Sequence, residues 1–247
     1  MRLPCLPLRA ACLGAGLLLL TPAFGAVQMP AVSYLEGLAW LGHASFRWSR
    51  GGKAVYFDPW RISSGPRDAD LVLIGHPHFD HLDPEGLARV AGPETEVVTV
   101  ADCAAKLKEA GFTGRLRVVK PGDEIRVKGI PVQVVPAYNT NKNFHQKESG
   151  WAGFVVELEG IRLYHAGDTD FIPEMNGLKA DVALLPVSGT YVMTAEEAAE
   201  AAKSIQPKVA VPMHYGSIVG TAADAQRFRD LCGGLIVEIM EKREQEA

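Results

Sequence analysis

The residues best suited to chemistry stand within six consecutive positions, in the order His76-Pro77-His78-Phe79-Asp80-His81. They directly follow residues 71–74, an aliphatic run that predicts a strand buried on both faces. Imidazole and carboxylate groups are good ligands for zinc and neighbouring transition metals, and a turn leaving a strand can direct them to one point. Four ligands at ~2.0–2.2 Å would crowd a single ion. The motif therefore predicts two metal ions, with a histidine-rich surface turn as the alternative.

The motif resembles the HxHxDH signature of metallo-β-lactamase-fold hydrolases. More closely, it resembles the branch that contains the ascorbate-phosphate lactonases and the N-acylphosphatidylethanolamine phospholipases D. Further segments that match this branch follow in the expected order and cover nearly the whole chain after the N-terminal segment. They are Trp40-Leu41-Gly42-His43-Ala44-Ser45-Phe46, Phe57-Asp58-Pro59, His165-Ala166-Gly167-Asp168-Thr169 and Pro212-Met213-His214-Tyr215-Gly216.

This resemblance implies a ligand set for two divalent metal ions. The first metal would be bound by His76, His78 and a third histidine, the second by Asp80, His81 and His214, and Asp168 would bridge both. The candidate for the third histidine is His145, which lies in a polar loop at residues 139–150, where the family order requires it. Its loop context departs from the strand-end histidine of lactonases, so a surface histidine is the alternative.

Other polar residues near these motifs each have two interpretations. His43 faces the pocket as a proton donor or substrate contact, or it is a satisfied core histidine. Asp58 and Asp83 are candidates for orienting ligand histidines through their second ring nitrogen, although a helix N-cap also explains Asp83. His165 is interpreted as structural. Tyr191 follows a strand and is a weaker candidate for contact with a developing oxyanion.

The function that the resemblance implies is metal-dependent hydrolysis of a small ester, lactone or phosphoester. A hydroxide shared by two metals attacks the substrate, and the catalytic candidates are Asp80, Asp168 and His43. Zinc is the expected metal, with manganese or iron as alternatives. Two other classes remain open: a metal-dependent oxidoreductase on the same fold, and a non-catalytic periplasmic metal-binding module. A β-lactamase is less favoured, because the N-terminal and C-terminal motifs match the lactonase-like branch.

Strands and helices alternate in a way that places these motifs at strand ends. Strands are expected at residues 38–46, 53–57, 71–74, 96–100 and 116–119, then in a strand-rich block over residues 124–165, and at residues 182–186, 209–213 and 235–238. Helices are expected from residue 84 and over residues 102–110, 194–204 and 222–231. The pattern and the resemblance together predict an α/β fold, a four-layer αββα sandwich of two mixed β-sheets with outer helices.

The N-terminus has the order of a secretory signal. Arg2 and Arg9 are its charged side chains, an apolar stretch covers residues 10–20, and small residues follow. We therefore expect a signal peptide over residues 1–25, a hydrolase domain over residues 26–247 and a periplasmic or secreted protein. The apolar stretch is short for a permanent membrane helix, so no stable membrane span is expected after its removal; a retained N-terminal anchor is the alternative.

Composition limits the partners. The 247 residues have a net charge of −4, with 47% hydrophobic and 22% charged side chains, as in an ordinary globular protein. An acidic balance gives no support to nucleic-acid binding, so a small-molecule substrate is expected, and the oligomeric state is open. Cys103 and Cys232 remain after removal of the signal, either as a disulfide or as two buried free thiols.

Overall fold

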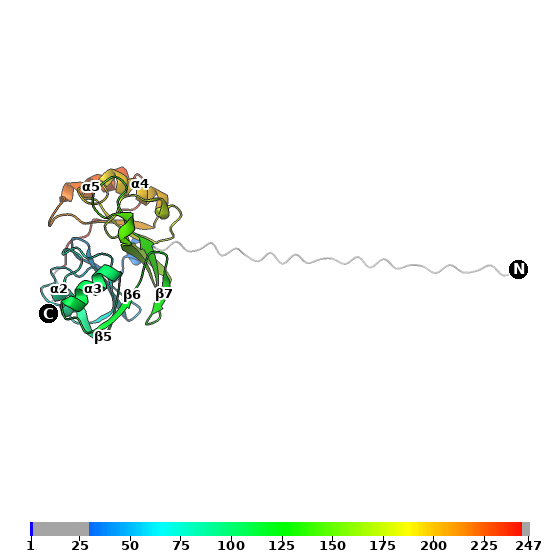
Figure 1. Cartoon of the computed structure of the whole chain (residues 1–247). Helices are drawn as coiled ribbons and strands as arrows, with labels where there is room; N and C mark the ends of the chain where they lie inside the picture. Colours follow the sequence, from blue (N-terminus) through cyan, green and yellow to red (C-terminus); the bar gives the residue numbers. More distant parts are fainter. Residues whose placement is uncertain (2–29, 244–247) are drawn as a thin grey trace.

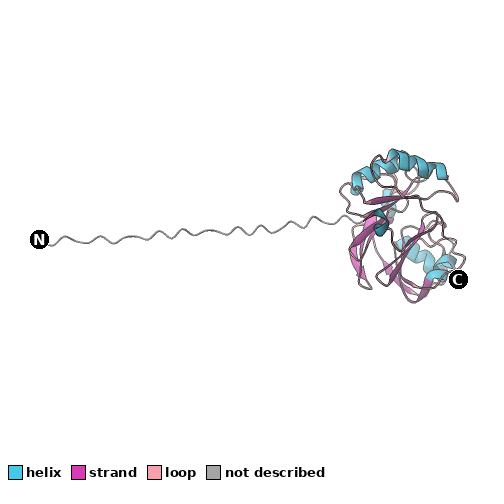
Figure 2. Cartoon of the chain, turned by 180° about the vertical axis from the view of Figure 1, so that it is seen from behind, coloured by secondary structure: helices cyan, strands magenta, loops and turns pink. Residues whose placement is uncertain are grey.

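The computed structural model describes Met1 and residues 30–243 (Figure 1). The predicted signal peptide, apart from Met1, lies outside the part of the chain that the structure describes. Within the described part, two six-stranded sheets lie between helices, and the strands of the two sheets form separate groups when the molecule is seen from behind (Figure 2). Among residues 30–243, no helix has both the length and the apolar character needed to cross a membrane.

The first sheet holds its strands in chain order. They are β1 Leu38–Gly42, β2 Ser45–Arg50, β3 Lys53–Phe57, β4 Ala69–Ile74, β5 Ala91–Thr99 and β6 Arg115–Val118. The first three strands pair antiparallel, whereas β3 to β6 run parallel. The sheet is therefore mixed, and β4, which leads into the histidine motif, lies in its interior.

The second sheet has the order β12-β11-β10-β9-β8-β7. Its strands are β7 Glu124–Val127, β8 Ile130–Pro136, β9 Ala152–Leu158, β10 Ile161–His165, β11 Val182–Pro186 and β12 Val209–Met213. Strands β7 to β10 pair antiparallel, and β10, β11 and β12 run parallel. Since parallel strands share one carboxyl edge, the segments after β10, β11 and β12 emerge on the same side of this sheet.

Helices form the outer layers. Helices α2 Pro84–Val90 and α3 Ala101–Glu109 contact β5 and β6, while α4 Ala195–Ile205 and α5 Ala222–Leu231 contact β11 and β12 (Figure 1). The short elements are α1 Ala31–Tyr34 and the 3-10 turns η1 Lys147–Ser149 and η2 Pro173–Met175. Capping boxes at Thr194 and Thr221 fix the starts of α4 and α5. The predicted αββα architecture is confirmed.

The two sheets meet at a contact between the aromatic rings of His165 and Phe57, which also indicates the role of His165. The ring of His165, at the end of β10, stacks on Phe57 of β3 with 5.1 Å between centroids and 6° between planes. Its Nε2 donates to the carbonyl of Ala44 at 2.8 Å. Because His165 is 1% exposed and occupied by these contacts, the structure agrees with its interpretation as a structural residue.

Two expected strands are interrupted or absent in the structure, and β5 begins at Ala91, five residues before its expected start. Residues 38–46 do not form one strand, because Gly42 and His43 adopt positive φ of 111° and 53° and turn the chain between β1 and β2. This turn needs the left-handed backbone conformation at His43, which residues other than glycine rarely adopt. Residues 235–238 form no regular strand and contribute only an isolated bridge between Val237 and Ala210.

Both cysteines of the described chain are free and buried. Cys103 lies in α3 and Cys232 caps the end of α5. Burial raises the pKa of Cys103 to about 12 and that of Cys232 to about 11. The structure therefore favours two unreactive thiols over a disulfide.

Candidate metal centre

The candidate ligands come from loops at the strand ends that meet between the two sheets. The histidine motif follows β4, Asp168 follows β10 and His214 follows β12. His43 lies in the turn between β1 and β2, and His145 lies in the loop between β8 and β9. The fold thus brings together all eight residues predicted as metal ligands or catalytic groups, in two adjoining groups.

The first cluster consists of His76, His78, His145 and Asp168, whose ligand atoms all lie within 4.8 Å of one another. The Nε2 atom of His145 is 3.1 Å from Nδ1 of His78 and 3.2 Å from Oδ2 of Asp168. The same carboxylate oxygen is 3.6 Å from Nε2 of His76. The structure therefore places His145 beside the two histidines with which the resemblance groups it.

The second cluster consists of His43, Asp80, His81 and His214, again with ligand atoms within 4.8 Å. Oδ2 of Asp80 is 3.0 Å from Nε2 of His43, 3.8 Å from Nε2 of His81 and 3.9 Å from Nε2 of His214. His43 was predicted as a catalytic candidate and was not among the predicted metal ligands, so its position among these ligand atoms is new. It follows from the left-handed turn, which directs this side chain inward.

Asp168 joins the two clusters. Its Oδ1 is 3.1 Å from Nε2 of His81, and its Oδ2 is 3.2 Å from Nε2 of both His145 and His214. The residue is 4% exposed. One buried carboxylate therefore contacts imidazoles of both clusters, as a bridging ligand would.

The polar atoms at this centre fit divalent cations. Four of them are buried and have no hydrogen-bond partner within the described chain: Nε2 of His76, His81 and His214, and Oδ1 of Asp168. A buried polar atom without a partner costs free energy, and these atoms point toward one another. Imidazole nitrogen and carboxylate oxygen are the donors that zinc and similar ions take. A pair of cations would satisfy atoms that the chain alone leaves unpaired.

The protonation states suit the same ligands. Burial lowers the pKa of His76 well below its usual value, which leaves the imidazole neutral with a free lone pair. Burial alone would raise the pKa of Asp168, but the imidazoles of His214 and His81 outweigh it and hold that pKa well below its usual range. Metal binding needs neutral imidazole and ionised carboxylate, and His76 and Asp168 meet this need at neutral pH. For His81, burial alone would lower the pKa, but the carboxylates of Asp168 and Asp58 outweigh it and raise that pKa well above its usual value, so a metal ion at this position would replace a proton.

Several groups hold the ligand rings from behind. Oδ2 of Asp58 accepts from Nδ1 of His81 at 2.7 Å, so that Nε2 of His81 faces the centre. The predicted orienting role of Asp58 therefore agrees with its position. Asp83 instead caps α2 by accepting from the backbone N–H of Glu85, and its other oxygen accepts from the backbone N–H of Arg61. The structure supports the N-cap interpretation of Asp83.

Other supporting contacts were missed by the sequence reasoning. The hydroxyl of Ser188 is 3.1 Å from Nδ1 of His214. Nδ1 of His145 donates to the carbonyl of Tyr191 at 3.1 Å, so Tyr191 contributes its backbone to the centre. Trp151 packs against the rings of three candidate ligands, with centroid distances of 5.2 Å to His76, 5.0 Å to His78 and 5.5 Å to His145.

We expect Asp58→Ala to reduce metal affinity by about 10–100-fold, the usual effect of removing a group that orients a ligand histidine. Without the carboxylate, the His81 ring loses its fixed tautomer and direction. Titration of the metal-free protein with zinc against a competing chelator measures this change. Asp83→Ala, which removes a cap but no ligand contact, should leave zinc affinity near its original value; equal affinities in the two variants would contradict the assignment.

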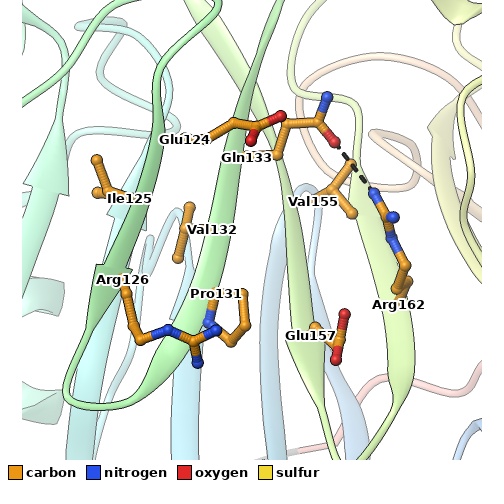
Figure 3. Close-up of a pocket in the computed structure, with 9 residues that line it drawn as sticks. All are labelled: Glu124, Ile125, Arg126, Pro131, Val132, Gln133, Val155, Glu157 and Arg162. Atoms are coloured by element: carbon orange, nitrogen blue, oxygen red, sulfur yellow. Dashed lines mark hydrogen bonds between the residues drawn. The ribbon is translucent and has the colours of Figure 1, made fainter.

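A separate hollow lies on the sheet face formed by β7 to β10 (Figure 3). Its volume is about 380 Å³, and its walls include Val132, Val155 and the side chain of Arg162, which donates to Gln133 at 3.1 Å. None of its lining residues belongs to the two clusters. The chemistry-bearing groups therefore gather at the strand ends between the sheets, away from this hollow.

Comparison with known proteins agrees with this architecture. Residues 37–214 match the β-lactamase superfamily domain. A UPF0173 metal-dependent hydrolase of Pyrococcus abyssi is 33% identical over 208 residues, which cover 78% of this chain and 90% of the relative. A relative with the same name from Methanoregula boonei is 35% identical over 202 residues, covering 78% of this chain and 87% of its own.

A solved structure shows the same arrangement. Igni18, a metallo hydrolase from Ignicoccus hospitalis, superposes with a TM-score of 0.68 at 27% identity and covers 84% of this chain and 95% of its own. These relatives do not distinguish the lactonase and phospholipase branch, so that closer resemblance stays a prediction. Because the superfamily domain matches residues 37–214, which are most of the chain, the chain belongs to the metallo-β-lactamase superfamily, among the UPF0173 metal-dependent hydrolases.

Proposed function

We propose that this metal-dependent hydrolase cleaves a small ester, lactone or phosphoester with two divalent metal ions, one at each cluster. The observation that carries the proposal is the position of Asp168, whose two carboxylate oxygens contact histidines of both clusters. A single mononuclear site would not need a buried carboxylate shared between two sets of ligands. Zinc is the proposed metal because imidazole nitrogens dominate the donor set, with manganese and iron as the alternatives to test.

Two such ions, when bound, acidify a water to a pKa near 7 and polarise a substrate oxygen. The chain itself must supply and hold the ligands in their binding states. Asp80 is kept ionised because the hydrogen bond from His43 and the nearby His81 outweigh burial and lower its pKa. Since a carboxylate only accepts, His43 carries its proton on Nε2, facing Asp80.

This geometry gives His43 a defined place in the proposed reaction. Its Nε2 lies at the second cluster, 3.0 Å from Oδ2 of Asp80, and its ring is fully buried. Burial lowers the pKa of His43, so its ring is neutral. His43 therefore orients Asp80 through the Nε2–H hydrogen bond and gives up no proton. The alternative of a satisfied core histidine is less favoured, because its Nδ1 is buried without a hydrogen-bond partner in the described chain.

A substrate panel tests the proposed function. Zinc-loaded protein is incubated with carboxylic esters, lactones, phosphomonoesters, phosphodiesters and β-lactams, and multiple turnover of at least one of the first four classes is expected. Binding of two metals without turnover of any substrate would instead favour the metal-binding module, and oxygen consumption with a reductant would favour the oxidoreductase. Either result would overturn the proposal.

We also propose that the chain is exported and loses residues 1–25. The proposal rests on the charged, apolar and small-residue order of the N-terminus. Mass spectrometry of protein from the native cell should show a chain that begins near Ala26, in the periplasmic or secreted fraction. Recovery of an intact chain starting at Met1 from the cytoplasmic fraction would contradict it.

A further inference from the structure

The residues of the two clusters differ in their exposure to solvent. Of the eight residues that form the two clusters, seven are at most 9% exposed, whereas His78 is half-buried. The next most exposed is Asp80, whose side chain is 13% exposed. The residue between these two is Phe79. The mouth of the site therefore lies at residues 78–80, where the two clusters adjoin.

Phe79 lies at this mouth with its side chain 67% exposed. Its neighbours on both sides direct their side chains inward, to the first and second clusters. Its ring meets that of Trp60 edge to face, with 6.3 Å between centroids. Trp60 in turn lies 5.3 Å from His43. Phe79 thus presents most of an aromatic ring to solvent directly beside the ligands.

A second exposed aromatic residue, Phe144, stands next to a residue of the first cluster in sequence. Phe144 is 46% exposed and directly precedes His145, whose Nε2 is 3.1 Å from Nδ1 of His78. Its ring packs edge-on against Tyr191, with centroids 4.8 Å apart. Trp151, which packs against His78, adds a third aromatic surface. Aromatic residues on three segments of the chain are therefore next to residues of the two clusters.

The cation nearest Phe144 in sequence is already neutralised. Nζ of Lys142 forms an ion pair with Asp170 and lies 3.5 Å from a carboxylate oxygen of Glu197. Its side chain is 15% exposed. Lys142 is therefore not free to receive an anionic group beside Phe144.

We infer that the substrate carries an apolar acyl or aryl group beside the bond that is cleaved, and that Phe79 and Phe144 receive it. This inference rests on the proposed function and names the substrate class within it. Exposed aromatic rings gain free energy when an apolar group covers them. Phe79 and Phe144 are specificity-determining residues on this account, since neither contacts the reacting atoms.

The test measures binding without turnover. Methylphosphonate and hexylphosphonate share a head group that binds metal, and they differ only in the tail. Calorimetric titration into the zinc-loaded full chain should show hexylphosphonate binding at least about tenfold more tightly, since each fully covered methylene is worth about fourfold. In F79A/F144A the ratio of hexylphosphonate affinity to methylphosphonate affinity should fall to about twofold. The methylphosphonate affinity should be unchanged and the metal content retained.

Ile236→Ala is the matched control. Ile236 is 51% exposed, and its backbone carbonyl accepts from the N–H of Ala210, near the start of β12. His214 follows the opposite end of β12, so Ile236 lies away from the metal centre. This variant should keep the full ratio. The inference is overturned if hexylphosphonate binds no more tightly than methylphosphonate, if neither binds, or if F79A/F144A keeps the ratio. A tail-dependent affinity together with no turnover of esters, lactones or phosphoesters would refute the proposed function alone.

Discussion

Asp168→Asn is expected to lower kcat/KM by more than about 100-fold while the fold survives, because removing a group that merely orients a ligand already costs about 10–100-fold. Asparagine keeps the shape of the side chain but removes the negative charge that imidazoles of both clusters contact. The side chain at position 168, shared by the two clusters, then loses its affinity for cations. Steady-state kinetics on the best substrate of the panel gives the ratio, and circular dichroism checks the fold.

Asp181→Asn provides the control for this variant. Asp181 precedes β11 and accepts from the backbone N–H of Arg162 at 2.9 Å, a bond that an amide oxygen can also accept. Its turnover should match that of the unaltered protein. Single-turnover hydrolysis in ¹⁸O-labelled water distinguishes direct attack by water from a covalent aspartyl intermediate. Label in the Asp168 side chain, or full activity of Asp168→Asn, would contradict the proposed role.

Removal of metal is expected to abolish turnover and to lower the melting temperature by about 10 °C. Bound ligand stabilises the folded state by about 4 kcal/mol at a thousandfold excess over Kd, and 1 kcal/mol shifts the melting temperature of a domain of this size by about 2–4 °C. The physical cause lies in the buried nitrogens of His76, His81 and His214, which have no partner in the described chain. Differential scanning calorimetry after chelation and dialysis measures the shift.

Adding zinc back should restore both turnover and melting temperature. Magnesium serves as the control, because it prefers six oxygen ligands and the clusters offer mainly imidazole nitrogen. Magnesium should restore neither property at the same concentration. An unchanged melting temperature and unchanged turnover after complete chelation would show that the centre does not depend on metal.

The sequence predicted the parts of the centre that are continuous in the chain. The motif from His76 to His81 directly follows a buried strand, so its position at a strand end could be inferred from local pattern. Asp168 and His214 were assigned through resemblance, and their strands, β10 and β12, end where expected. The two-sheet architecture followed from the same alternation of strands and helices.

The parts that depend on contacts between distant segments were not predictable from pattern. Ser188 meets His214 across 26 positions, and the Tyr191 carbonyl meets His145 across 46. Serine and a backbone carbonyl carry no signature of such a role. A pocket-facing His43 was one of two interpretations of the sequence, but its place among the ligand atoms depends on its left-handed φ of 53°, which the pattern of a continuous strand does not indicate.

The number of metal ions bound per chain tests the central claim most directly. Protein loaded with zinc and freed of excess metal is analysed by plasma mass spectrometry, with chain concentration from amino-acid analysis. Two ions per chain are expected, falling to about one in His145→Ala, which weakens the first site, and to about one in His214→Ala, which weakens the second. One ion or none in the unaltered protein would contradict the two-metal account, and two retained ions in His145→Ala would remove His145 from it.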